Sequence, residues 1–495
     1  LPKWNPMNVC SYHLQEAGAT PEEELSFALA TAIAVLDDLK DKVPTEAFPA
    51  MVGRISFFVN AGIRFVTEMC KMRAFVELWD EITHERYGVE DPKFRRFRYG
   101  VQVNSLGLTE QQPENNVYRI LIEMLAVTLS KNARARAVQL PAWNEALGLP
   151  RPWDQQWSLR MQQILAYETD LLEYDDLFDE NPAVTRKVEA LKAGTRAELA
   201  QIDAMGGAVG AIEYMKSRLV ESNAARIARI ETGETTVVGV NRWTEGAESP
   251  LTAGDGAIMV VDAAAEADQI SRLDTWRSAR DSTAVGRALS DLRAAAASGA
   301  NIMGPSIAAA KAGVTTGEWG DMLRDAFGQY RGPTGVSKNP SNRTEGLDEL
   351  RDQVDVVSDK LGRRLKFVMA KPGLDGHSNG AEQIASRARD CGMDITYDGI
   401  RMTPEEIVES ARDENADVIG ISILSGSHLP LVEELMEKLA RNDDNNTPVV
   451  VGGIIPDIDV DRLLKLGVSK VYTPKDFELN LIMKDLITLV ADKVS

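Results

Sequence analysis

The chain has 495 residues, of which 44% are hydrophobic and 26% charged, and its formal net charge is −20. This length predicts two or three domains with substantial cores. The excess of acidic residues excludes a general binder of nucleic acid or of anionic membranes, because phosphate recognition needs clustered Lys and Arg. No apolar run approaches the roughly 18–20 residues that cross a bilayer. Three scattered cysteines predict neither a disulfide framework nor a zinc site. We therefore expect a cytoplasmic protein.

The first part of the chain alternates predicted strands with predicted helices. Thr20, Pro21 and Glu23 give the pattern of a capping box, which predicts a helix that ends near Asp41. The other predicted elements are strands over residues 8–12 and 98–104 and helices over residues 57–79, 116–130 and 182–232. Such alternation indicates a parallel sheet, and the visible strands are about half of the eight that a (β/α)8 barrel requires. The chain begins with strand-like sequence and without Met, so we expect that the N-terminal segment of the barrel is absent from it.

A less regular region leads to a second alternating region. Helices are predicted over residues 272–297 and 318–328, and the Gly-, Pro-, Ser- and Asn-rich residues 330–343 predict a linker. Five apolar runs follow, at residues 365–370, 394–397, 417–424, 447–452 and 470–473. Strands separated by helices in this way indicate a doubly wound domain of the flavodoxin-like kind. The expected divisions are a barrel portion (1–245), a helical connector with the linker (246–360) and the doubly wound domain (361–495).

Residues 371–380, Lys-Pro-Gly-Leu-Asp-Gly-His-Ser-Asn-Gly, follow the first strand of that domain and precede a helical pattern. Loops at this position in α/β sheets hold ligand-binding residues. A neutral imidazole at His377 can bind a metal through one ring nitrogen while Asp375 accepts from the other, and Lys371 can pair with Asp375. Spacing alone leaves two interpretations open, a metal ligand or an ordinary Asp-Gly turn.

Two further strand ends in this domain carry small residues. Ser422 lies at the end of one predicted strand, and Gly452 and Gly453 end the next, where paired glycines let a bulky ligand approach the backbone. Each has a plain interpretation as a strand-to-helix turn, but three such ends on one sheet edge build a crevice. His428 either lines that crevice or is a polar loop residue, and His84 lies in a charged run and is expected to be solvated.

Together these motifs resemble the cobalamin-binding domain of the adenosylcobalamin-dependent acyl-CoA mutase family. Residues 375–380 match its Asp-x-His-x-x-Gly signature, Ser422-Ile-Leu424 its Ser-x-Leu, and Gly452-Gly453 its glycine pair. The resemblance implies that His377 is the lower axial ligand of cobalt and that Lys371 and Asp375 form the catalytic relay behind it. The cofactor-binding residues that it implies are Asp375, Gly376, His377, Gly380, Ser422, Leu424, Gly452, Gly453 and Tyr472.

The N-terminal part resembles the substrate barrel of the same family. Residues 12–19, Tyr-His-Leu-Gln-Glu-Ala-Gly-Ala, are similar to its Tyr-His-x-x-Glu-Ala-Gly-Ala segment. By this resemblance Tyr12 and His13 are catalytic, with His13 donating to the thioester carbonyl, where charge develops. The substrate-binding residues that it implies are Asn5, His13, Arg73 and Gln102. The implied fold is the C-terminal portion of a TIM (β/α)8 barrel with a flavodoxin-like cobalamin-binding domain.

Departures from the methylmalonyl-CoA mutase pattern favour the ethylmalonyl-CoA branch of the family. Gly100-Val-Gln102 stands where methylmalonyl-CoA mutases usually carry His-Cys-Gln, and residues 136–139 stand in place of Gln-Ser-Leu-His. Gly100 leaves room for an extra methylene, although one methylene is worth only about 1–3 kcal/mol of discrimination.

The resemblance therefore implies a radical carbon-skeleton isomerase, a homodimer that uses adenosylcobalamin to convert an acyl-CoA, most closely ethylmalonyl-CoA to methylsuccinyl-CoA. Methylmalonyl-CoA mutase activity is the alternative within the family. A non-catalytic corrinoid carrier or cobalamin sensor is the alternative from another class. Tyr12 and His13 weigh against the carrier, because a carrier has no use for an acyl-CoA barrel.

Overall fold

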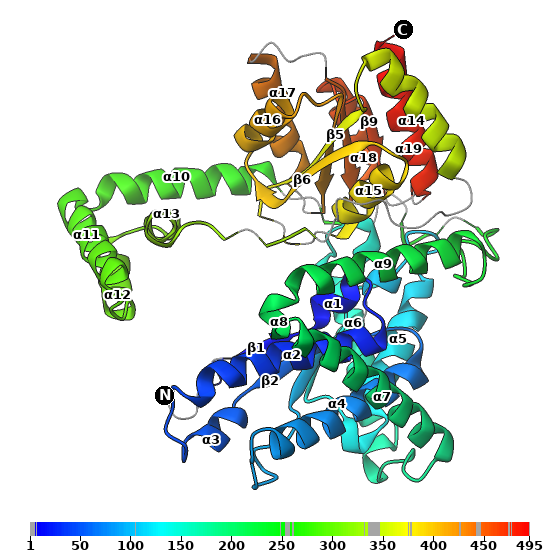
Figure 1. Ribbon diagram of the computed structural model, residues 1–495, viewed down its shortest axis with the longest axis vertical. Helices are drawn as coiled ribbons and strands as arrows, with labels where there is room; N and C mark the ends of the chain where they lie inside the picture. Colours follow the sequence, from blue (N-terminus) through cyan, green and yellow to red (C-terminus); the bar gives the residue numbers. More distant parts are fainter. Residues whose placement is uncertain are drawn as a thin grey trace. The chain divides into compact units, whose positions relative to one another are not determined.

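The computed structural model describes the following residues: 5, 7–103, 105–247, 249–252, 258–259, 262–330, 332–334, 347–374, 376, 379–424, 427–441, 447–473, 476 and 478–494 (Figure 1). The chain divides into two compact units, one made of Leu1–Met259 with Pro333–Ser495 and the other of Val260–Gly332. Within the described part of the chain, no helix has both the length and the apolar character that a bilayer crossing requires.

Four parallel strands form the first sheet, in the order in which they occur along the chain. They are β1 (Asn8–Cys10), β2 (Ser56–Ala61), β3 (Tyr99–Val103) and β4 (Ala137–Gln139). Parallel strands in chain order with helical crossovers are the pattern of a barrel wall. The predicted α/β fold with a parallel sheet is confirmed, and closure into a barrel stays a prediction.

Helices connect these strands and continue beyond them. They are α1 (Tyr12–Glu16), α2 (Pro21–Lys40), α3 (Phe48–Val52), α4 (Phe65–Glu85), α5 (Asn115–Thr128), α6 (Pro152–Tyr167), α7 (Pro182–Ala204), α8 (Gly207–Gly210) and α9 (Ile212–Glu231). The capping box predicted for α2 is confirmed, because the Thr20 N–H donates to Glu23 Oε2 at 2.9 Å and Thr20 Oγ1 accepts from the Glu23 N–H at 3.2 Å.

The predicted helix over residues 57–79 is wrong at its start. Ser56–Ala61 forms β2, and α4 begins only at Phe65. Phe57 and Val59 are buried against the helices, and alternation places Phe58 on the opposite face of the sheet. Aromatic and β-branched residues that alternate in this way favour a strand over a helix.

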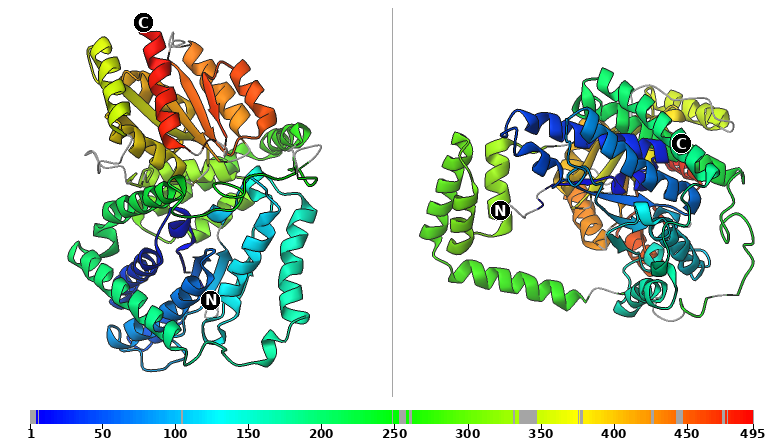
Figure 2. Two further views of the ribbon diagram at one scale, coloured as in Figure 1. Left: turned by 90° about the vertical axis from the view of Figure 1, so that its right-hand side faces the viewer. Right: turned by 90° about the horizontal axis from the view of Figure 1, so that it is seen from below.

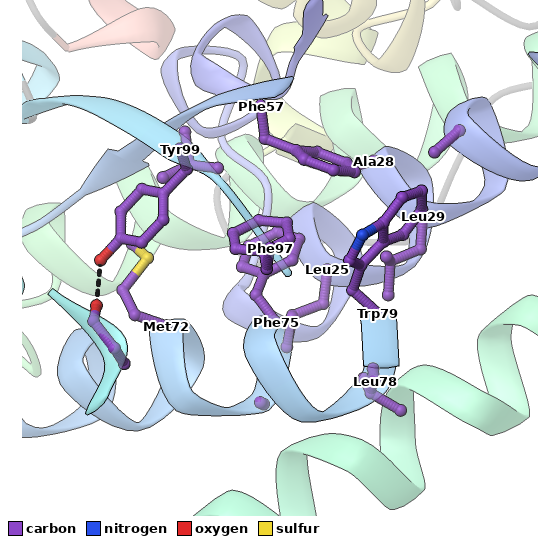
Figure 3. Packing of buried hydrophobic residues seen from close by; sticks show 14 of the residues in the cluster. Leu25, Ala28, Leu29, Phe57, Met72, Phe75, Leu78, Trp79, Phe97 and Tyr99 are labelled. Carbon is purple, nitrogen blue, oxygen red and sulfur yellow. Dashed lines mark hydrogen bonds between the residues drawn. The ribbon is translucent and has the colours of Figure 1, made fainter. Parts of the chain in front are cut away.

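Aromatic rings dominate the core between the first sheet and its helices (Figure 3). Phe75 stacks on Phe97 with ring centroids 4.9 Å apart and planes 12° apart. Phe57 meets Trp79 edge-on, also at 4.9 Å. These rings join β2 and the approach to β3 to α4, and they therefore fix which face of the sheet the helices cover.

The second sheet has five parallel strands in the order β6-β5-β7-β8-β9. The strands are β5 (Lys366–Pro372), β6 (Asp394–Met402), β7 (Val418–Ile423), β8 (Val449–Gly453) and β9 (Lys470–Tyr472). Numbered within the domain, this order is 2-1-3-4-5, which is that of flavodoxin-like folds. The predicted flavodoxin-like domain and its five strands are confirmed.

Helices cover both faces of the second sheet, as Figure 2 shows. One face packs against α14 (Leu347–Leu361), α15 (Asn379–Asp390) and α19 (Leu479–Lys493). The other face packs against α16 (Pro404–Asp413), α17 (His428–Arg441) and α18 (Asp457–Lys465). Strands buried on both sides explain the continuous apolar runs that predicted them.

The unit Val260–Gly332 is helical in its described residues. It contains α10 (Ala263–Ala279), α11 (Ser282–Ser298), α12 (Met303–Ala312) and α13 (Thr316–Phe327). The single helix predicted over residues 272–297 is wrong, because Asp281 accepts from the Thr283 N–H at 2.9 Å and caps the start of a new helix.

We expect Phe75→Ala to destabilise the first unit by about 3–5 kcal/mol, because it removes a fully buried ring and leaves a cavity. Urea unfolding followed by tryptophan fluorescence would measure the loss. Phe327→Ala is the matched control, since this ring is 65% exposed and its removal should change the free energy by less than about 0.5 kcal/mol. Equal effects of the two substitutions would contradict the assigned core.

Candidate functional site

A cavity of about 1140 Å³ lies in the first unit, at the carboxyl ends of strands from both sheets. The loops that follow β2, β3, β7 and β9 contribute to its lining, and so do residues of β8 itself. Carboxyl ends of parallel strands are the edge at which α/β proteins bind ligands. The cavity is therefore the candidate functional site.

The structure brings together most of the residues predicted to bind the cofactor. Ser422 and Gly452 are register partners on β7 and β8, and Gly452 is paired in turn with Tyr472 on β9. A Cβ atom added to Gly380 would lie 3.9 Å from Ser422 Oγ. The predicted residues that line the cavity are Gly380, Ser422, Leu424, Gly452, Gly453 and Tyr472.

Glycine residues on β7 and β8 keep this side of the cavity open and let a ligand approach the backbone. Gly453 has φ +140°, and a Cβ atom there would meet the Ile423 carbonyl oxygen at 1.8 Å. Gly420, which also lines the cavity, would carry a Cβ atom 2.6 Å from the Phe367 ring. Glycine is thus required at both positions. Near these glycines the cavity is lined by apolar residues, which are Phe367, Met369, Val450, Leu479, Ile482 and Leu486.

Lys371 is fully buried at the end of β5, and its Nζ donates to the Ser422 carbonyl oxygen at 3.5 Å. Gly376 is exposed. Asp375 and His377 lie outside the described residues, so the relay and the cobalt ligand stay predictions. His428 is not among the residues that line the cavity; it is buried at the start of α17.

Tyr12, His13 and Gln102 meet at the carboxyl end of the first sheet. Gln102 Nε2 donates to Tyr12 Oη at 3.0 Å, and the rings of Tyr12 and His13 lie edge-on with centroids 5.1 Å apart. Tyr12 is buried, whereas His13 is exposed. The His13 imidazole is therefore accessible, whereas Tyr12 is held by Gln102 of the sheet.

The other two predicted substrate residues lie elsewhere. The side-chain amide of Asn5 is 2.8 Å from Ser56 Oγ, at the amino end of β2. Arg73 on α4 donates to Asp176 Oδ2 at 3.2 Å and to Asp179 Oδ1 at 2.5 Å. Neither residue lines the cavity, and Tyr12, His13 and Gln102 are not among its lining residues either.

A buried ammonium group anchors the turn that carries Tyr12 and His13. Lys71 on α4 is fully buried between the carboxylates of Glu24 and Glu68, and its Nζ also donates to Gln15 Oε1 at 3.4 Å. Glu24 in turn accepts from Ser11 Oγ at 2.8 Å. The two carboxylates raise the pKa of Lys71 against the opposing effect of burial, so this side chain is charged.

Charged residues next to the cavity were missed by the sequence reasoning. Glu16 lines it and accepts from Asn60 Nδ2 at 3.2 Å. Arg226 on α9 lines it and donates to the Leu106 carbonyl oxygen at 3.3 Å, and burial lowers the pKa of its guanidinium. Glu16 lies in the Glu-Ala-Gly-Ala segment that the sequence analysis had singled out. Arg226 lies on α9, where the sequence showed only helical periodicity, and periodicity alone does not indicate which face of a helix meets a cavity.

A second missed feature is a group of arginines at the opposite edge of the first sheet. Arg54, Arg98 and Arg136 stand one or two residues before β2, β3 and β4. Burial lowers the pKa of Arg98, and repulsion from Arg136, Arg54 and Arg96 lowers it further. Gathered positive charge in a chain of net charge −20 suits a polyanionic ligand. An arginine before each of three successive strands was the signal in the sequence.

The fold and the site define an α/β protein in which two parallel sheets share one ligand cavity. The chain belongs to the methylmalonyl-CoA mutase family: the family model described as methylmalonyl-CoA mutase matches residues 1–329. A model described as B12 binding domain matches residues 365–475. The predicted family membership and the cobalamin-binding domain are confirmed.

Curated relatives agree with this assignment. The ethylmalonyl-CoA mutase of Cereibacter sphaeroides is 76% identical over 490 residues, which cover 99% of this chain and 75% of that protein. That of Methylorubrum extorquens is 64% identical over 99% of this chain and 72% of its own length. The methylmalonyl-CoA mutase of Cereibacter sphaeroides is 32% identical over 96% of this chain and 66% of its own length. A crystal structure of a cobalamin-binding protein from Desulfitobacterium hafniense DCB-2 aligns with 46% of this chain at 20% identity and a TM-score of 0.22, a likeness too low to bear on function.

We expect Lys71→Met to destabilise the first unit by about 3–5 kcal/mol, because it leaves buried carboxylates without their counter-charge. Lys42→Met is the matched control: Lys42 pairs with Asp38 at 2.7 Å, but its side chain is 65% exposed, and the loss should stay within about 1 kcal/mol. Urea denaturation of both variants checks this. A Lys71→Met protein as stable as the control would show that the buried cluster contributes nothing.

Proposed function

We propose that the protein is an adenosylcobalamin-dependent isomerase that converts ethylmalonyl-CoA to methylsuccinyl-CoA. This proposal rests on one cavity that is shared by the carboxyl edges of both sheets, in a chain that is 76% and 64% identical to two ethylmalonyl-CoA mutases. Such a cavity lets a cofactor held by one sheet face a substrate held by the other.

The residues of the cavity fit the nucleotide tail of cobalamin. A bulky tail needs backbone without side chains, and Gly420, Gly452 and Gly453 leave that space on β7 and β8. Ser422 adds a hydroxyl beside the apolar residues of the second sheet that line this side of the cavity. His377 would hold the cobalt, with Asp375 and Lys371 behind it. When bound, the cofactor supplies the carbon-centred radical that begins the rearrangement.

His13 and Tyr12 provide the substrate chemistry in this proposal. The exposed imidazole of His13 donates a hydrogen bond to the thioester oxygen, where negative charge develops as the acyl group migrates. Tyr12, held by Gln102 at 3.0 Å, fixes the orientation of its neighbour. The buried surroundings of Tyr12 exclude water from this side of the acyl chain, which protects a reactive carbon centre.

The arginines at the amino edge of the first sheet suit the phosphates of CoA. Arg54, Arg98 and Arg136 would hold the nucleotide end of the substrate, while the thioester reaches toward His13 at the carboxyl edge. Asn5 lies at the same amino edge. Arg73 is engaged by two aspartates, so its contact with CoA would require exchange of these partners.

Gly100 supports the choice of ethylmalonyl-CoA over methylmalonyl-CoA. A Cβ atom at this position would lie 3.2 Å from the Phe58 ring, on the same face as Gln102. A larger residue would displace that ring, whose centroid is 6.1 Å from that of the Tyr12 ring. Methylmalonyl-CoA mutase activity remains the second candidate. We further propose a cytoplasmic homodimer, as the family resemblance implies.

Assayed side by side with adenosylcobalamin, ethylmalonyl-CoA should be turned over with a higher kcat/KM than methylmalonyl-CoA. The enzyme and His377→Ala would also be titrated with the cofactor anaerobically. We expect the wild-type absorption spectrum to show a base-off, His-on form that the variant loses. A preference for methylmalonyl-CoA would overturn the substrate assignment, and an unchanged spectrum in His377→Ala would overturn the cobalt ligand.

Arg98→Ala and Arg136→Ala should each raise KM for the acyl-CoA about tenfold to a hundredfold, because each removes a charge-assisted contact to phosphate. Neither should affect the corresponding acyl-pantetheine thioester, which lacks the phosphates. Arg412→Ala is the control, since Arg412 is exposed on α16 and pairs only locally, with Asp413 at 3.4 Å. An equal rise in KM for both substrates would place the arginines outside the phosphate site.

A further inference from the structure

One buried polar side chain in the wall of the cavity is left unsatisfied by the part of the chain that the structure describes. This residue is Asn223 on α9, which is 5% exposed. Its side-chain oxygen Oδ1 is buried and receives no hydrogen bond from the described residues. A buried oxygen without a donor is costly, and native structures keep few of them. In the wall of a ligand cavity, such an oxygen indicates a ligand that brings an N–H or O–H group to it.

The position of Asn223 is set by the turn that follows α1. Gly18 in that turn has φ +98°, and a Cβ atom on it would lie 2.3 Å from Asn223 Cβ and 2.9 Å from Asn223 Cγ. Only glycine fits there. The Asn223 side chain therefore packs directly against the turn, and Gly18 lines the cavity beside it. This contact holds the unsatisfied oxygen at the cavity wall.

Arg226 lies three residues after Asn223 and lines the cavity from the same face of α9. A guanidinium carries five N–H donors. Within the described residues, the hydrogen bond that Arg226 makes is to the Leu106 carbonyl oxygen, at 3.3 Å. This single bond leaves most of the donors for a ligand.

The charge of Arg226 is offset by Glu16. The Glu16 carboxylate also lines the cavity and interacts electrostatically with Arg226. The two side chains hold the backbone of Leu106 between them, since Glu16 Oε1 accepts from the Leu106 N–H at 3.4 Å and Arg226 donates to the Leu106 carbonyl oxygen. We call Glu16, Asn223 and Arg226 the polar corner. Its formal charges cancel, which favours a neutral polar group over an anion.

A neutral group that fits the polar corner must accept from a guanidinium and donate to an amide oxygen. A primary carboxamide does both, with its carbonyl oxygen and its NH2 group in one plane. A carboxylate or a thioester carbonyl has no donor for Asn223 Oδ1. In the cofactor of the proposed function, the side chains of the corrin ring carry primary carboxamides. The amino edge of adenine has the same pattern of an acceptor beside a donor.

The polar corner lies next to the helix that follows the predicted cobalt ligand. Gln383 on α15 is buried, and its Nε2 donates to the Val220 carbonyl oxygen at 3.0 Å. Val220 precedes Asn223 on α9 by about one turn. The α15 helix begins at Asn379, two residues after His377. The periphery of a corrin ring bound through His377 is therefore the nearer source of a carboxamide, since the adenosyl group lies on the opposite face of the ring.

We propose that Asn223 and Arg226 form a subsite for a primary carboxamide of the corrin ring. Asn223 accepts from the NH2 group of the carboxamide, and Arg226 donates to its oxygen. This inference rests on the proposed function. It adds a contact to the ring itself from α9, whereas the glycines of β7 and β8 suit the nucleotide tail.

Absorbance titrations of the whole chain with two corrinoids test the subsite. Adenosylcobalamin carries the adenosyl group and methylcobalamin lacks it, but both have the same ring carboxamides. Asn223→Ala and Arg226→Met should each raise Kd for both corrinoids about fivefold to tenfold, because each removes hydrogen bonds to the carboxamide. Arg226→Lys keeps a donor and should lose less than Arg226→Met. Glu221→Ala is the control, since Glu221 is exposed on α9 and does not line the cavity.

Thermal unfolding of the chain without cofactor separates a ligand contact from a structural one. Asn223→Ala removes a buried oxygen that accepts no hydrogen bond from the described residues, so its Tm should stay close to that of wild type. A merely structural residue would show the reverse, a lower Tm with unchanged Kd. Arg226→Met also loses the bond to Leu106 and should unfold slightly earlier.

Unchanged Kd values in Asn223→Ala and Arg226→Met would overturn the subsite, as would a raised KM for ethylmalonyl-CoA with corrinoid binding unaffected. Weakening of adenosylcobalamin alone would assign the polar corner to the amino edge of adenine and overturn its assignment to the ring. The wild-type titration decides the proposed function separately, because a chain that binds neither corrinoid does not hold the cofactor. If Asn223→Ala unfolds below the assay temperature, Asn223→Ser takes its place with the same outcomes.

Discussion

The site depends on backbone that carries no side chains at the carboxyl edge of the second sheet. Gly453 has a conformation and a neighbour that exclude any Cβ atom, and a Cβ atom added to Gly420 would lie 2.6 Å from the Phe367 ring. With glycine at these positions, β7 and β8 can pair in register and still leave a cavity beside Ser422. Side chains at these positions would either disturb the pairing of the strands or fill the cavity. Cofactor binding and sheet pairing are therefore satisfied by the same residues.

The first sheet has a different role, because it holds polar and charged groups in fixed places. Lys71 is buried among carboxylates, and this cluster ties the turn of Tyr12 and His13 to α2 and α4. Arginines such as Arg98 stand at the opposite edge of the same strands. A sheet of parallel strands separates these two ends by the length of a strand, which is the geometry that a long acyl-CoA needs.

The sequence predicted the second domain better than the first, for a physical reason. Strands buried on both faces give continuous apolar runs, so all five were found. In the first sheet β2 was mistaken for the start of a helix, because Phe57 and Val59 run directly into the long apolar pattern of α4. Ser422 and the paired glycines were found from their position at the ends of predicted strands and from the family resemblance. The buried Lys71 cluster was not, because its partners lie 47 and 3 residues away in the chain and only the fold brings them together.

In the proposed function, the cavity receives a cobalamin whose own base has been displaced by His377. The electron paramagnetic resonance spectrum of cob(II)alamin bound to the chain labelled with 15N-histidine tests it directly. Coordination by a labelled imidazole predicts that each cobalt line splits in two, because the 15N nucleus has spin one half. Splitting of each line in three, as unlabelled nitrogen gives, would mean that the cofactor has kept its dimethylbenzimidazole and would contradict ligation by a histidine of the chain.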